Sequence, residues 1–194
     1  MAWDMDDLRK VVGTMKNDKD KLMVYLAWYT GSRLGECLSV RPEDIYKDTK
    51  SGIWVISIKP DRSEAEYISK IDSSAKTDNA RRIVPIHREL LKHLKNFKIE
   101  GTGWKRKKTN AYSNYFGRQK LLITDTVNSI STQYSFHSIR HNVATNFQRA
   151  KVEESISARL VGHSTVGATM TYGYYSEGVE FEEALKAVNK LPVL

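Results

Sequence analysis

The sequence predicts an α+β fold that is mainly helical and carries one small antiparallel sheet. Apolar residues recur at helical spacing in several segments, beginning with residues 5–16, whereas residues 53–58 form a run of β-branched and aromatic side chains. The chain has 194 residues, of which 40% are hydrophobic, and this is the size of one domain with its own core. We therefore expect a single domain over residues 1–194.

Helices are expected at the start of the chain. After residues 5–16, a second helix at 18–29 has apolar side chains around most of its circumference, so we expect its neighbours to surround it. Gly31 follows this helix as its expected C-cap. A short helix at 34–40 is expected to stop before Pro42, because the residue before a proline disfavours helical conformation.

Strands are expected in the next part of the chain. Residues 53–58 form the first strand, which ends at Pro60. Residues 67–71 and 81–86 are expected to form two more strands, with a hairpin turn over 75–80. Together these segments predict a three-stranded antiparallel meander.

The remainder is expected to be helical, apart from a basic, glycine-containing loop at 101–108. The expected helices cover residues 87–97, 109–122, 137–149, 153–161, 165–173 and 177–190.

Composition narrows the classes of function. Lysine and arginine number 31 against 23 aspartate and glutamate, which gives a net charge of +8 and favours a polyanionic partner such as nucleic acid. The single cysteine excludes an internal disulfide. No apolar run approaches the ~20 residues that span a bilayer, and the acidic, polar N-terminus does not resemble a signal peptide, so we expect no membrane partner.

The first chemical motif is T-G-S-R-L-G-E, where Arg33 lies between two apolar helices. A guanidinium there can clamp an anion through two parallel hydrogen bonds, and Glu36 is close enough in sequence to orient it. The same residues are also compatible with an ordinary surface arginine.

The second motif is H-S-I-R-H. His137 and Arg140 are three residues apart, so a helix places both on one face, where a cation and an imidazole suit an anionic oxygen and a nearby proton transfer. His137 and His141 also have a spacing that can bind a metal ion. Position 138 is Ser rather than the Glu of a zinc-protease helix, and no cysteine or carboxylate cluster follows, so we expect no metal.

The third and fourth motifs add a tyrosine and a lysine. His163 follows a glycine, and Tyr172 lies nine residues further on, close to Tyr174 and Tyr175. A tyrosine among bases and cations can act as a nucleophile. More often the ring of a tyrosine is packed against apolar neighbours while its hydroxyl contacts water. Lys76 lies at the expected hairpin, where a lysine can deliver a proton to a leaving oxygen or simply remain solvated.

In this order the motifs resemble the catalytic domain of the tyrosine recombinases, the phage integrase family. The order is T-G-x-R-x-x-E, a hairpin lysine before R-x-V-P-I, then H-x-x-R, L-x-G-H and a tyrosine nine residues later. R-P-E-D-I at 41–45 is similar too, and the resemblance covers about residues 5–175. It implies a site-specific recombinase or integrase that cuts and rejoins DNA through a 3′-phosphotyrosine, in phage or mobile-element integration or excision.

The resemblance places the catalytic positions at Arg33, Lys76, His137, Arg140, His163 and Tyr172. It implies that the tyrosine attacks phosphorus, that the first histidine accepts its proton, and that the lysine protonates the leaving oxygen. The two arginines and the second histidine would bind the phosphate oxygens, with Glu36 supporting the cluster. Because the phosphotyrosine conserves the energy of the phosphodiester bond, the resemblance implies no cofactor, ATP or metal.

The expected partner is double-stranded DNA. The candidate DNA-contacting residues are the basic ones near the hairpin and in the basic loop, namely Arg81, Arg82, Lys105, Arg106, Lys107 and Lys108. Members of the family usually carry an additional N-terminal helical domain, so this chain resembles the catalytic domain alone. We expect a homotetramer on DNA for the full-length protein, a possible monomer for this part, and a cytoplasmic, nucleoid-associated protein encoded by a bacterium or phage.

Three alternatives stay open from the sequence. A type IB topoisomerase uses similar groups to relax supercoils, and an inactive relative would only bind DNA. The tail at 177–194 forms an amphipathic helix that either packs on its own domain or docks on a neighbouring subunit.

Overall fold

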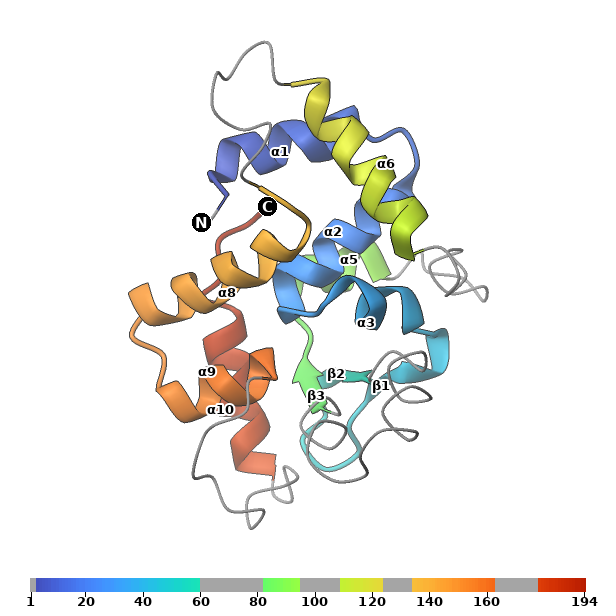
Figure 1. Ribbon diagram of the computed structural model, residues 1–194. Coiled ribbons are helices and arrows are strands. Elements are labelled where there is room, and N and C mark those ends of the chain that lie inside the picture. The colour runs from blue at the N-terminus through green and yellow to red at the C-terminus, as the bar shows by residue number, and fades with distance from the viewer. Residues whose placement is uncertain (1–2, 60–81, 95–108, 124–133, 163–177) are drawn as a thin grey trace, which may run out of the picture.

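The computed structural model describes residues 3–59, 82–94, 109–123, 134–162 and 178–194 (Figure 1). The helices are α1 (Met5–Thr14), α2 (Asp18–Thr30), α3 (Leu34–Ser39), the 3-10 turn η1 (Pro42–Asp44), α5 (Arg88–Leu94), α6 (Thr109–Leu121), α8 (His137–Arg149), α9 (Glu154–Val161) and α10 (Gly178–Val188). The strands are β1 (Ile45–Lys47), β2 (Trp54–Ile58) and β3 (Arg82–Pro85). The mainly helical α+β prediction is confirmed.

Helix α2 forms the centre of the domain (Figure 1). It contacts α3, α5 and α8, and nine of its residues are buried, among them Trp28 and Tyr29. The prediction of a helix surrounded by its neighbours is therefore confirmed. Its C-cap is Gly31, whose φ of 65° lies in the left-handed region that glycine adopts without strain.

The sheet is three-stranded and antiparallel, in the order β1-β2-β3. Ile56 in the middle strand pairs with Ile45 on one side and Val84 on the other. Strand β1 was not expected, because it is only three residues long and two of them are exposed, so it lacks the alternating pattern that marks a half-buried strand. The expected strand and turn at 67–71 and 75–80, and the helix at 165–173, lie outside the described residues.

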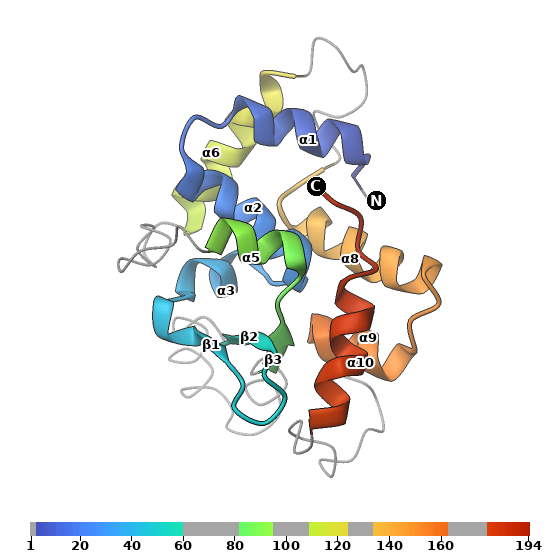
Figure 2. The same cartoon turned by 180° about the vertical axis from the view of Figure 1, so that it is seen from behind.

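Helices α8, α9 and α10 lie together on one side of α2, and Figure 2 shows α10 from the front. Helix α10 contacts α9 and β3 of the same chain, and its residues Phe181, Ala184, Ala187 and Val188 are buried there.

The residues after α10 return to the N-terminal helices (Figures 1 and 2). The indole Nε1 of Trp28 donates to the carbonyl of Pro192 at 2.8 Å, and the backbone N–H of Leu194 donates to the hydroxyl of Tyr29 at 3.1 Å. The tail thus makes specific contacts with its own chain, and its docking on a neighbouring subunit stays a prediction. Within the described segments, no helix has the length and apolar character needed to cross a membrane.

Candidate active site

Arg33 is held by the helix that it precedes. It is the N-cap of α3, and both carboxylate oxygens of Glu36 accept hydrogen bonds from it. Its backbone N–H donates to Oε2 at 3.0 Å and its Nη1 donates to Oε1 at 2.9 Å. The carboxylate is buried, whereas the Arg33 side chain is 42% exposed, so the guanidinium is oriented from one side and accessible from another. This is the contact with Glu36 that the sequence spacing predicts.

Arg140 lies beneath the surface and ties three segments together. From α8, its Nη1 donates to the carbonyl of Gly31 at 2.8 Å and to that of Val161, and its Nη2 donates to the carbonyl of Gly162 at 3.1 Å. A guanidinium has five N–H donors. Two of them, the Nε–H and one on Nη2, therefore have no acceptor among the described residues. The arginine that is expected to bind a phosphate is fixed in place by backbone carbonyls.

Arg82 corrects an expectation from the sequence. It was predicted to contact DNA, but the side chain is only 4% exposed and points into the domain. Its Nη2 donates to Oε2 of Glu36 at 3.0 Å and to Oγ of Ser32 at 3.1 Å, while its Nε donates to the carbonyl of Leu160 at 2.9 Å. A side chain buried in these contacts is not a surface cation for the DNA backbone.

His137 begins α8 and is exposed, one turn before the buried Arg140. Partial burial, His141 and the charges of Arg140 and Arg33 lower the pKa of His137, so the imidazole is neutral and able to accept a proton at pH 7. Its ring lies 5.1 Å from that of His141 in an edge-on arrangement. Among the residues that the structure describes, no group of three or more His, Cys, Asp or Glu side chains could hold a metal ion.

The described part of the site is strongly positive. Three guanidinium groups, those of Arg33, Arg82 and Arg140, surround the single carboxylate of Glu36. Burial raises the pKa of Glu36, but Arg82 and Arg33 outweigh burial and lower it below its usual value. Burial and the charges of Arg33 and Arg82 lower the pKa of Arg140 to about 10, so it remains a cation at neutral pH. Such a cluster favours an anion beside it.

Four segments distant in sequence form this cluster. In Figure 1 the junction of α2 with α3, the start of α8, the end of α9 and strand β3 meet in the middle of the molecule. Three of the expected catalytic residues, Lys76, His163 and Tyr172, lie outside the described residues, as do Arg81, Lys105, Arg106, Lys107 and Lys108. Their roles stay predictions.

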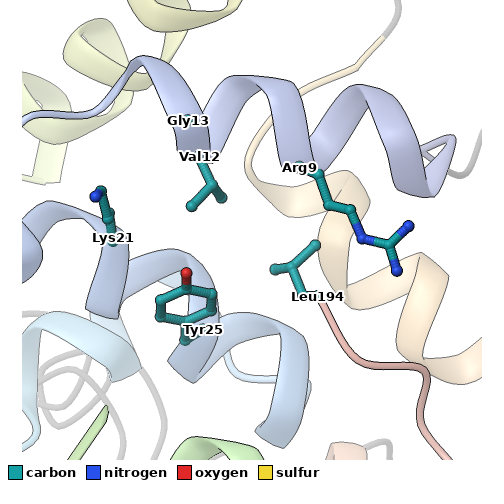
Figure 3. Close-up of a pocket in the computed structure, with 6 residues that line it drawn as sticks. All are labelled: Arg9, Val12, Gly13, Lys21, Tyr25 and Leu194. Carbon is teal, nitrogen blue, oxygen red and sulfur yellow. The ribbon is translucent and has the colours of Figure 1, made fainter.

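A separate pocket lies between α1, α2 and the end of the chain (Figure 3). It is lined by Arg9, Val12, Gly13, Lys21, Tyr25 and Leu194. The guanidinium of Arg9 is bound to Asp6 and to the carbonyl of Val193, and Lys21 is paired with Asp18. The pocket contains none of the expected catalytic residues and is not the active-site candidate.

The sequence matches the phage integrase family model over residues 3–177. The chain belongs to the phage integrase family. It is 26% identical to the "Tyrosine recombinase XerC-like" of Caldanaerobacter subterraneus in an alignment 186 residues long, which covers 84% of this chain and 47% of that protein. It is 28% identical to a "Tyrosine recombinase" of Pseudothermotoga lettingae in an alignment 188 residues long, which covers 92% of this chain and 56% of the relative. The chain thus spans about half the length of these curated relatives.

Solved structures share the fold. The integrase from mycobacterium phage Brujita matches with a TM-score of 0.61 and 14% identity, over 96% of this chain and 56% of that one. The XerH site-specific recombinase, solved bound to its palindromic difH substrate in a post-cleavage complex, matches with a TM-score of 0.57 and 17% identity. That match covers 85% of this chain and 47% of the recombinase. The helices and the three-stranded sheet are therefore those of a known architecture.

Proposed function

We propose that this chain is the catalytic domain of a tyrosine-type site-specific recombinase, which cuts and rejoins DNA through a 3′-phosphotyrosine. The observation that carries the proposal is the cluster of Arg33 and Arg140 around Glu36, in a member of the phage integrase family. One arginine is accessible and oriented by a buried carboxylate, and the other is fixed by three carbonyls. Rigid, charged donors of this kind suit a phosphate whose oxygens gain negative charge during the reaction.

The proposed cleavage step is a displacement at phosphorus. The hydroxyl oxygen of Tyr172 attacks the scissile phosphate, the bond from phosphorus to the 5′-oxygen breaks, and a 3′-phosphotyrosine and a 5′-hydroxyl result. His137 takes the tyrosine proton, and Lys76 gives a proton to the departing oxygen. Arg33, Arg140 and His163 bind the non-bridging oxygens. Attack by a 5′-hydroxyl from another strand reverses these steps and rejoins the DNA, with no cofactor or external energy source.

Double-stranded DNA is the proposed partner. The DNA-bound state of XerH, which shares the fold, and the net charge of +8 support it. For the full-length protein we propose a homotetramer on DNA, and for this domain alone a monomer in the absence of DNA. A role in integration or excision of a phage or mobile element, in the cytoplasm of a bacterial cell, agrees with the family.

A nicked suicide DNA substrate tests the proposal, because loss of a short cleaved fragment traps the covalent protein–DNA adduct. Since the natural site is unknown, a library of nicked duplexes with randomised sequence is the probe, and adducts are recovered by their resistance to denaturation. The wild-type chain should form an adduct, as should the Tyr174→Phe control, whereas Tyr172→Phe should form none.

The same assay separates the alternatives. An adduct in the Tyr172→Phe protein would show that another residue is the nucleophile. The absence of any adduct with wild-type protein, alongside measurable DNA binding, would favour a binding module. Relaxation of a supercoiled plasmid without exchange between two sites would favour a topoisomerase.

A further inference from the structure

We infer that Arg82 is a positioning residue for the cleavage reaction: through Glu36 it sets the guanidinium of Arg33, and it packs against Gly162 at the end of α9, whose carbonyl binds Arg140. This inference rests on the proposed function, since it concerns groups that bind the reacting phosphate. Arg82 itself stays inside the domain and does not touch DNA.

The first support is the number of elements that this one guanidinium joins. From strand β3, its Nε bonds the carbonyl of Leu160 at 2.9 Å, near the end of α9, and its Nη2 bonds Ser32 and Glu36 on either side of the start of α3. These partners are 46 to 78 residues distant in sequence. The planar guanidinium group of an arginine fixes the direction of each of its hydrogen bonds, whereas the ammonium group of a lysine does not.

The second support is the carboxylate that Arg82 shares with Arg33. Oε1 of Glu36 accepts from the Arg33 side chain, and Oε2 accepts from both the Arg33 backbone and Arg82. Glu36 is only 3% exposed, so few other donors can replace Arg82 there. Removing Arg82 would leave the buried carboxylate hydrogen-bonded to Arg33 alone, so that the two side chains could turn together.

The third support is Gly162, which directly precedes His163. Gly162 has a φ of 78°, and a Cβ added to it would lie 2.9 Å from Nη1 and 3.2 Å from Cζ of Arg82. Its carbonyl accepts a hydrogen bond from Arg140 at 3.1 Å. The residue is therefore enclosed by two arginines, one against its Cα and one on its carbonyl. Such close backbone approach requires glycine.

The substitutions Arg82→Met and Arg82→Lys test the inference in the full 194-residue chain, with Arg88→Met as the matched control. Arg88 is an exposed arginine six residues further along, outside the cluster. Single-turnover adduct formation is measured on a suicide duplex recovered with the wild-type protein, and DNA affinity is measured separately. We expect Arg82→Met to lower the cleavage rate constant about 100-fold, the usual cost of a small misplacement of catalytic groups. DNA affinity should change less than about threefold, because no contact with the phosphate backbone is lost.

A duplex with a methylphosphonate at the scissile position separates positioning from mere stabilisation of the fold. This linkage replaces one charged oxygen by a neutral methyl group, so correct placement of phosphate-binding cations matters less. If Arg82 acts through them, the rate loss of Arg82→Met should shrink at least several-fold on this substrate, as should that of Arg33→Met. Equal losses on both substrates would overturn the inference, as would wild-type cleavage by Arg82→Met.

Two further variants keep the test decisive if Arg82→Met does not fold. Arg82→Lys keeps the positive charge but not the planar guanidinium group, and its cleavage rate constant should fall about tenfold. Glu36→Gln should also cleave more slowly, with a smaller loss on the methylphosphonate duplex than on the ordinary one. Wild-type rates for both would refute the positioning role. If the wild-type chain itself forms no adduct, the proposed function fails and this inference fails with it, whereas failure of Arg82 alone leaves the proposed function intact.

Discussion

Replacing Gly162 by alanine tests the close packing beneath the site most directly. A residue with a Cβ at the φ of 78° carries a cost of about 1–2 kcal/mol in the left-handed region. The new methyl group would also lie 2.9 Å from Nη1 of Arg82, so the guanidinium has to move. Movement weakens its bonds to Leu160 and Glu36, and loss of one charged hydrogen bond costs about 1.5–3 kcal/mol. The free energy of unfolding should therefore fall by about 2.5–5 kcal/mol.

Denaturant unfolding followed by tryptophan fluorescence measures this change, and Gly117→Ala is the matched control. Gly117 lies inside α6, and nothing lies within 4 Å of an added Cβ, so alanine there should raise stability by about 1 kcal/mol through helix propensity. The two Gly→Ala substitutions thus have opposite expected signs. A Gly162→Ala protein that unfolds within about 0.5 kcal/mol of wild type would refute the packing described between Gly162 and Arg82.

Three further predictions concern the charged groups. Arg33→Ala should lower the rate of adduct formation about 10²–10³-fold, the usual loss for a preorganised donor to a developing negative charge, and an unchanged rate would remove Arg33 from the mechanism. Glu36→Gln should destabilise the protein by about 3 kcal/mol at pH 7, because it breaks a buried ion pair. The pKa of Glu36 is lowered in the folded state, so its ion pair contributes to the free energy of unfolding above pH 4.5. This contribution is lost as the pH falls through the lowered pKa, so the stabilities of wild type and Glu36→Gln should converge in acid. Burial and the neighbouring charges also lower the pKa of His137 from its ordinary value of 6.5. The acid-side fall in the pH–rate profile should therefore lie below pH 6.5, and His137→Gln should remove it.

Local sequence patterns predicted most of the described elements. The helix at 137–149 agrees with α8 in both bounds, and the expected C-cap at Gly31 is the residue where α2 ends. These features depend on neighbouring residues alone, through apolar periodicity and the conformational freedom of glycine. The contact of Arg33 with Glu36 was also predictable, because the two are three residues apart at a helix start.

Features set by distant residues were not predictable in this way. Arg82 stands beside Arg81 and looks like part of a basic surface patch, but Glu36, Ser32 and Leu160 receive its guanidinium inside the domain. The three acceptors of Arg140 are backbone carbonyls, which every residue has, so no residue type in the sequence indicates these contacts. The one local signal for burial is the position of Arg82 as the first residue of a strand whose following residues are apolar.

The hydrogen bond between Trp28 and Pro192 limits which changes to the C-terminal tail can test whether the tail docks on a neighbouring subunit. Trp28 is fully buried in the central helix, so deleting the last residues would leave its indole N–H without an acceptor. A truncated protein could then lose activity because its core has loosened, even if no neighbouring subunit ever receives the tail. Substitutions at exposed positions of the tail, such as Val193, alter its surface and leave this anchor in place.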